Sequence, residues 1–180
     1  MLFLTIMLLL LSNVVLVISW YLSRDVNSYE LVQSSFKNLD KYFSRKYVKF
    51  LKYLIMPPES LLPLMIIIQP IFEEYVFRYV PLVKLYIQRH IDIISTFIIC
   101  LTINALWTLL HYPQYRRLLK FKHWLCIYLA GLGFLTSSIA MLVLSTHCAL
   151  SDMYVWLTPT IQHIIFNCCG YFRDRFKSSK

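Results

Sequence analysis

Five stretches of mostly apolar residues alternate with short polar links along the chain. They cover residues 2–22, 61–88, 93–111, 124–147 and 154–172. A transmembrane α-helix needs about 20 predominantly apolar residues to cross the hydrocarbon core of a bilayer, and each stretch approaches or exceeds that length. The pattern therefore predicts an all-α fold, a polytopic transmembrane helical bundle of about five spans.

Composition agrees with this prediction, because 58% of the residues are hydrophobic and only 15% are charged. The formal net charge of +9 could indicate affinity for nucleic acid. However, the lysines and arginines lie mainly in the links between apolar stretches, as membrane topology requires. We therefore expect the lipid bilayer to be a partner and expect no nucleic acid.

The basic residues also predict an orientation. Fifteen lysines and arginines lie in the 23–59 link, the 112–123 link and the C-terminal tail, whereas the links on the other side hold only Lys84 and Arg89. Links that are rich in lysine and arginine face the cytosol. We expect an integral multi-pass membrane protein whose C-terminus is cytosolic and whose N-terminus lies on the opposite side.

Three regions are expected along the chain. Residues 1–59 comprise an N-terminal membrane anchor and a basic segment, residues 60–172 a membrane core, and residues 173–180 a basic cytosolic tail. We interpret residues 2–22 as a retained anchor rather than a signal peptide, because no basic residue precedes them and no clear cleavage site follows. Within 42–53, aromatic residues and lysines interleave, which fits either an interfacial amphipathic helix or a solvated one.

Three ionisable residues, Glu73, Glu74 and Arg78, lie inside the second apolar stretch. A charge at the centre of a membrane span costs roughly 2.5–3.5 kcal/mol on insertion scales, so such residues need a partner or a function. Glu74 and Arg78 are four residues apart and share a helical face, which predicts an ion pair. Glu73 points about 100° away from Glu74 and needs a different partner.

The same stretch contains three prolines, Pro63, Pro70 and Pro81. Proline removes a backbone donor and clashes with the preceding helical turn. The prolines therefore predict kinks or a broken helix near Glu73, tolerable where protein or water satisfies the freed carbonyls.

Polar residues in two later stretches are expected at a similar depth. Glu73 and His111 lie about 27 and 30 Å from a turn near Ile91, at a rise of about 1.5 Å per residue. His163 and Asn167 lie about 20 and 26 Å from a turn near residue 150 on the same scale. The two are also four residues apart, hence on one face of a helix. All four side chains can therefore meet in the half of the membrane nearer the cytosol.

These residues form three short motifs: Glu-Glu-x-x-x-Arg at 73–78, aromatic-x-x-x-His at 107–111 and His-x-x-x-Asn at 163–167. Their order resembles the three motifs of the CAAX protease and bacteriocin-processing (CPBP) family of intramembrane proteases, which includes the type II CAAX prenyl endopeptidases. The resemblance covers roughly residues 60–172 and implies a four-helix catalytic core. Trp107 stands where the family usually has phenylalanine, and Tyr79 where a glycine is common.

The resemblance implies a role for each matching residue. Glu73 corresponds to the catalytic carboxylate that activates water, and Glu74 and Arg78 to its supporting pair. The remaining catalytic positions are His111, His163 and Asn167. Carboxylate and imidazole groups suit general acid–base chemistry, and paired hydrogen-bond donors suit an oxyanion. The implied activity is that of an intramembrane endopeptidase, a CAAX prenyl protease-like peptide hydrolase.

Several alternatives stay open at this point. A zinc-dependent form of the protease would use Glu73, His111 and His163 as ligands, although we favour a reaction without a cofactor. A catalytically inactive membrane scaffold is a second alternative. The expected substrate is a membrane-associated protein or peptide, with a prenylated CAAX protein as one candidate. In a eukaryotic cell, the expected location is the endoplasmic reticulum.

Overall fold

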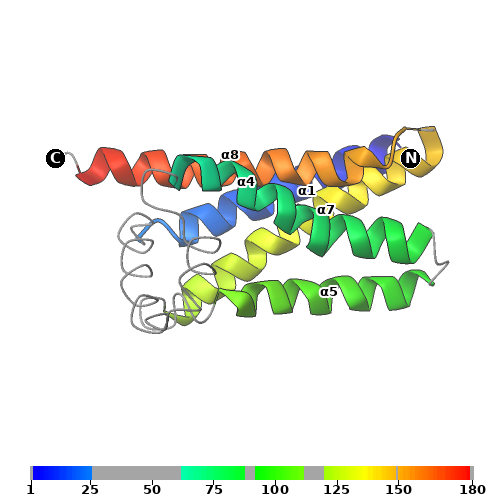
Figure 1. Cartoon of the computed structure of the whole chain (residues 1–180), viewed down its shortest axis with the longest axis horizontal. Coiled ribbons are helices and arrows are strands. Elements are labelled where there is room, and N and C mark those ends of the chain that lie inside the picture. Colours follow the sequence, from blue (N-terminus) through cyan, green and yellow to red (C-terminus); the bar gives the residue numbers. More distant parts are fainter. Residues whose placement is uncertain (1, 26–61, 88–91, 112–119, 149, 179–180) are drawn as a thin grey trace, which may run out of the picture.

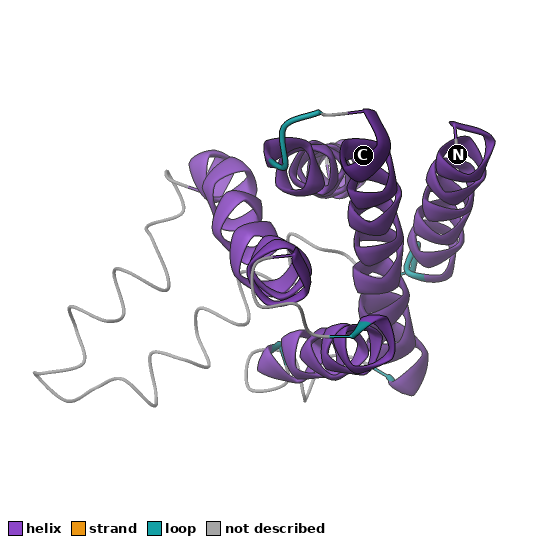
Figure 2. Ribbon diagram, turned by 90° about the vertical axis from the view of Figure 1, so that its right-hand side faces the viewer, coloured by secondary structure: helices purple, strands orange, loops and turns teal. Residues whose placement is uncertain are grey.

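A computed structural model describes residues 2–25, 62–87, 92–111, 120–148 and 150–178 of the chain. Every regular element in these ranges is a helix (Figure 2). The elements are α1 (Leu2–Leu22), α4 (Leu62–Glu74), the π-helix η2 (Tyr75–Ile87), α5 (Ile93–Leu110), α7 (Phe121–Cys148) and α8 (Met153–Ser178). The predicted all-α bundle is confirmed, and a helical segment falls on each of the five apolar stretches. The segment at 42–53 lies outside the described residues.

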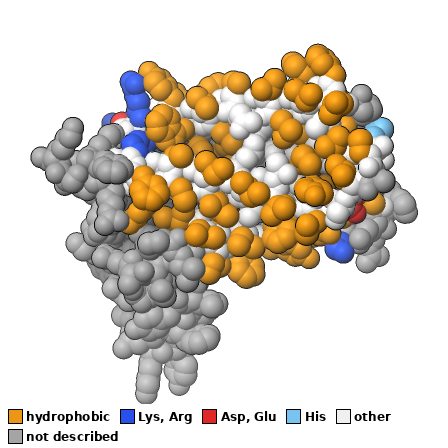
Figure 3. Space-filling view, turned by 90° about the horizontal axis from the view of Figure 1, so that it is seen from above, with side chains coloured by type: hydrophobic (Ala, Val, Ile, Leu, Met, Phe, Trp, Pro, Cys, Tyr) orange, Lys and Arg blue, Asp and Glu red, His pale blue; other side chains and the backbone are white. Residues whose placement is uncertain are grey.

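Two helices, Leu2–Leu22 and Phe121–Cys148, are by themselves long and apolar enough to cross a membrane. The second apolar stretch is divided between α4 and η2, which are 13 residues each. Polar residues interrupt α8. On the face shown in Figure 3, hydrophobic side chains cover most of the length, and the charged side chains lie toward the two ends. This distribution is typical of a surface in contact with lipid.

Helix α7 runs through the middle of the bundle and contacts α1, α5, α8 and η2 (Figure 1). In addition, α4 packs on α8 and η2 packs on α5. An apolar cluster fixes η2, α5, α7 and α8 against one another; its buried members are Leu82, Val83, Cys100, Leu135, Met141, Leu142 and Val155. These contacts set the positions from which polar side chains of four helical segments reach the interior.

Helix α1 packs closely along α7. Ser12 Oγ donates to the carbonyl of Gly133 at 2.9 Å, and Ser19 Oγ donates to the carbonyl of Cys126 at 2.7 Å. A Cβ atom at Gly133 would lie 2.9 Å from the side chain of Leu16, so the glycine is needed for this approach. Small residues and interhelical hydrogen bonds are the usual means of helix association in membranes. Residues 2–22 are therefore packed as part of the bundle.

The second apolar stretch changes helix type between Glu74 and Tyr75, where α4 ends and η2 begins. The kinks or break expected near Glu73 correspond here to a change of helix type without an interruption of the helix. Pro81 lies inside η2 and has no N–H to donate. Within η2, the carbonyl of Phe77 accepts a hydrogen bond from Arg78 Nη1 at 3.2 Å. Short π segments recur at functional sites, and this one directly follows the two glutamates.

Candidate active site

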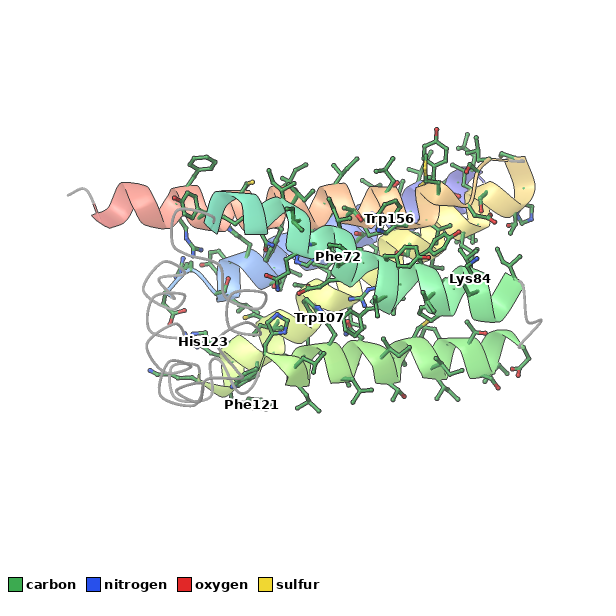
Figure 4. All side chains as sticks on the ribbon, viewed as in Figure 1. Phe72, Lys84, Trp107, Phe121, His123 and Trp156 are labelled. Atoms are coloured by element: carbon green, nitrogen blue, oxygen red, sulfur yellow. The ribbon has the colours of Figure 1, made fainter. Side chains whose placement is uncertain are left out.

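Glu73 lies on the last turn of α4, and both of its carboxylate oxygens are hydrogen-bonded. Gln69 Nε2 donates to Oε1 at 2.5 Å, and Trp107 Nε1 donates to Oε2 at 2.8 Å. The side chain of Glu73 is 16% exposed. The partner that the sequence did not identify for Glu73 is thus the indole of Trp107 on α5. The side-chain amide of Gln69, one turn earlier on α4, is a second donor. Figure 4 shows Trp107 pointing from α5 toward α4.

Glu74 is more deeply buried and joins two helices. Its Oε2 lies 3.7 Å from Arg78 Nε, and both side chains are 1% exposed. Its Oε1 lies 2.8 Å from Nδ1 of His163 on α8. A carboxylate of this kind can only accept, so Nδ1 of His163 carries the proton of this hydrogen bond. Glu74 therefore orients the histidine while it balances the charge of Arg78.

Arg78 has further partners that share its buried charge. Nη2 donates to Asn104 Oδ1 at 3.0 Å and to the carbonyl of Gly131 at 3.1 Å. Asn104 in turn donates from Nδ2 to the carbonyl of Tyr128 at 3.2 Å. A buried cation is tolerated where charges and dipoles compensate it. The network ties η2, α5 and α7 together beside Glu74.

His163 lies between the two carboxylates. Its Nε2 is 4.0 Å from Glu73 Oε2, on the side of the ring opposite Glu74. The ring of Phe134 stacks on the imidazole, with centroids 4.4 Å apart and planes 20° apart. This stacking fixes the plane of the imidazole. The structure therefore brings Glu73 and His163 together from helices that are far apart in the sequence.

His111 caps the C-terminus of α5, one turn after Trp107. Its Nδ1 is 2.9 Å from the carbonyl of Trp107, and the two rings meet edge to face with centroids 4.8 Å apart. A carbonyl only accepts, so Nδ1 carries the proton here as well. His111 and His163 thus share one arrangement, in which an acceptor lies next to Nδ1 and fixes the tautomer of the ring.

Asn167 follows His163 by one turn on α8 and is half-buried. Among the described residues, no hydrogen bond involves its side chain. The described network therefore includes Glu73, Glu74, Arg78 and His163 directly and reaches His111 through Trp107. It does not include Asn167.

A comparison with protein families identifies the family of this chain. The model of the type II CAAX prenyl endopeptidase Rce1-like family matches residues 57–169, more than half of the 180-residue chain. The chain belongs to the Rce1-like family. Comparisons with curated proteins and with solved structures each gave no match. The resemblance drawn from the three motifs is thereby confirmed. As an Rce1-like chain with two strongly apolar helices, it falls in a class of membrane proteases.

The zinc-dependent form of an Rce1-like site can be tested on the donor atoms. Nδ1 of His163 faces Glu74, and Nδ1 of His111 faces a carbonyl, so each ring would offer Nε2 to a metal, as metal-ligating histidines commonly do. Within the described ranges, no group of three or more His, Cys, Asp or Glu side chains could hold a metal ion. Glu73, His111 and His163 are thus not drawn together as a metal site in this structure, and the zinc-dependent form stays a prediction.

Three residues of this Rce1-like site were not singled out by the sequence patterns: Gln69, Asn104 and Phe134. Asn104 carries a usable signal, since it is a polar residue inside an apolar stretch and lies one turn from Thr108 and two turns from His111. Phe134 carries none, because a phenylalanine in an apolar helix is ordinary. Trp107 was noted as a departure from the family pattern, but its bond to Glu73 could not be read from the sequence.

Proposed function

We propose that this protein is an intramembrane endopeptidase in which Glu73 activates a water molecule for attack on a peptide bond. The observation that supports this most directly is the approach of Glu73 Oε2 to Nε2 of His163 at 4.0 Å, inside the bundle. A gap of more than 3.5 Å between two polar atoms is the kind that a water molecule bridges. Glu73 is also partly exposed, so water can reach it.

In the proposed reaction, Glu73 takes a proton from the bridging water, and the water oxygen forms a bond to the carbonyl carbon of the substrate. The resulting oxyanion needs donors in a site that excludes bulk water. His163 can donate from Nε2 only when it carries both ring protons, and Glu74 Oε1 is then its counter-ion at 2.8 Å. Glu73 finally passes its proton to the leaving amine, and the peptide C–N bond breaks.

Two further residues complete the proposed mechanism. Nε2 of His111 can accept a hydrogen bond from the attacking water, because Nδ1 is engaged with the Trp107 carbonyl. The amide of Asn167 is a second oxyanion donor that would engage when substrate is bound. The carboxamide lies one turn from His163 and has no other described hydrogen bond to give up. Removal of such a donor typically costs about 2.7–4 kcal/mol of transition-state stabilisation.

The proposed substrate is a membrane-bound protein with a prenylated CAAX terminus, from which the C-terminal tripeptide is removed. Membership of the Rce1-like family supports this choice. We further propose five membrane spans with a cytosolic C-terminus, which in a eukaryotic cell would lie in the endoplasmic reticulum. The site then opens near the cytosolic side, where the basic links are concentrated and where a lipid-modified C-terminus is available.

The test is cleavage of a prenylated CAAX peptide by the purified protein in bicelles, with the released tripeptide measured by mass spectrometry. Glu73→Gln keeps the size of the side chain and an acceptor for Trp107, and the Gln69 amide can turn to match it. We expect this variant to fold like the wild type and release no tripeptide. Tripeptide release at the wild-type rate by Glu73→Gln would contradict the proposal.

Two controls separate the alternatives. Cleavage that continues after chelation, by protein without bound metal, supports the reaction without a cofactor, whereas loss of cleavage restored by zinc supports the metal form. A folded wild-type protein that cleaves neither prenylated nor unprenylated peptides would favour the scaffold alternative.

A further inference from the structure

We propose that Trp107 is a positioning residue for Glu73, acting through its indole N–H on one carboxylate oxygen. This inference rests on the proposed function of Glu73. Trp107 is 4% exposed. Its Nε1 donates to Oε2 of Glu73 at 2.8 Å, and the two residues are 34 positions apart in the sequence. The same oxygen is the one that faces Nε2 of His163. The indole therefore holds the atom on which the chemistry depends.

A second, partly buried indole in the same bundle makes a different kind of hydrogen bond. Trp156 on α8 donates from Nε1 to the carbonyl of Ile71 at 3.0 Å, which is an ordinary structural hydrogen bond to a backbone acceptor (Figure 4). Both tryptophans thus reach α4 from a neighbouring helix. Trp107 differs because its acceptor is a carboxylate. A phenylalanine at 107 would keep a ring in the site but lose the hold on Glu73.

Two donors together fix the carboxylate of Glu73. Trp107 binds Oε2 from α5, and Gln69 binds Oε1 from the preceding turn of α4. Rotation about the terminal side-chain bond, which is broad for a free glutamate, breaks both bonds. A base must lie within hydrogen-bond reach of the proton it takes, so a fixed orientation toward His163 serves the reaction.

The ring of Trp107 also touches the other charged and titratable groups of the site. Its centroid lies 5.6 Å from Arg78 Cζ, 4.8 Å from the His111 ring and 6.0 Å from the His163 ring. The Trp107 side chain is therefore close to the proposed base, Glu73, to the buried cation, Arg78, and to both histidines. This arrangement predicts an effect on the rate of the bound complex rather than on the binding of substrate.

The experiment compares Trp107→Phe with Trp156→Phe, which removes a similarly placed indole that does not touch Glu73. We expect Trp107→Phe to lower kcat about 10- to 100-fold, as small misplacements of catalytic groups do. KM should stay within about twofold, because ground-state binding is unchanged. Trp156→Phe should leave both parameters within about twofold. Equal losses in the two variants, or a kcat unchanged in Trp107→Phe, would overturn the inference.

A second measurement does not depend on activity. The chain has four tryptophans, so the ¹⁵N-indole spectrum of the full-length protein contains four N–H signals, which single Trp→Phe variants assign. In Glu73→Gln, the Trp107 signal should shift, because its acceptor loses its charge, and the Trp156 signal should not. An unmoved Trp107 signal would overturn the inference even in an active enzyme. If the wild type cleaves nothing, the proposed function fails, and this signal alone decides whether Trp107 holds Glu73.

Discussion

His163 Nδ1 lies 2.8 Å from Oε1 of Glu74, so the histidine of α8 is bound by the glutamate that follows Glu73 in the sequence. The two adjacent acids thereby serve different purposes. Glu74 is 1% exposed and is held between Arg78 and His163, whereas Glu73 is 16% exposed and is held by neutral donors. Glu74, the paired and buried acid, holds His163 and Arg78 in place, and its partly exposed neighbour Glu73 is the proposed base.

Replacement of Glu74 by glutamine should be far more destabilising than the same change at Glu73. It removes the negative charge beside Arg78 and leaves a buried cation without its counter-ion, which typically costs about 3–5 kcal/mol. Glu73→Gln, in a more exposed position, should cost less than about 1 kcal/mol. Reversible unfolding in bicelles measures both.

A double-mutant cycle tests the reason for this difference. When Arg78→Met is combined with Glu74→Gln, the loss should be smaller than the sum of the two single losses, because no charge is left unpaired. Additive losses would show that Glu74 and Arg78 do not act as a pair.

Gly131 should not tolerate even one additional methyl group. A Cβ atom there would overlap Asn104 Oδ1, the acceptor for Arg78, and would lie 3.0 Å from the Trp107 ring. We expect Gly131→Ala to destabilise the protein by about 1–3 kcal/mol, as overpacking does, and to reduce cleavage. Gly133→Ala is the matched control. Its Cβ would meet Leu16 and the carbonyl of Ser12 on α1 instead of Asn104 and Trp107, so this variant should also lose stability but have a smaller effect on cleavage.

The two serines of α1 should hold this helix on α7. Ser12 and Ser19 are 0% and 1% exposed, and each donates to a backbone carbonyl of α7. Interhelical hydrogen bonds in membranes average about 0.6 kcal/mol, and valine at these positions also adds bulk to a close interface. The double change to valine should therefore speed hydrogen exchange in α1 and leave η2 and α5 unaffected. Val17→Ala, at a position 64% exposed, should change nothing.

A pH-dependent ion pair joins the end of α1 to α7. The hydrogen bond from Lys122 Nζ at 2.6 Å is the main reason that the pKa of Asp25 falls from 3.8 to about 2. Since the pKa is lower in the folded state, this stabilisation is present above about pH 4 and is lost as the pH falls through about 2. Asp25→Asn should therefore lower Tm slightly at pH 7. Its difference from the wild type should shrink as the pH falls from about 4 and disappear below about pH 2, which thermal unfolding followed by circular dichroism measures.

Much of this architecture follows from the sequence for simple physical reasons. Five apolar stretches determine five helical segments, because a backbone that is removed from water must satisfy its own hydrogen bonds. Spacing within one helix is equally informative: the interval of four residues between Glu74 and Arg78 predicts their ion pair. The prolines predict an irregular second stretch, and the helix changes type there, from α4 to η2.

Apolar stretches and residue spacing within one helix do not predict which side chains of different helices come into contact. The sequence left Glu73 without a partner and gave no reason to join Trp107 to it, or Glu74 to His163. These contacts depend on the rotation and offset of α4, α5 and α8 relative to one another, which the packing of apolar side chains around α7 decides. Periodicity fixes which residues share a face of one helix, and only tertiary packing fixes which faces meet. The sequence therefore supplied the acids and histidines, and the packed bundle assigned their partners.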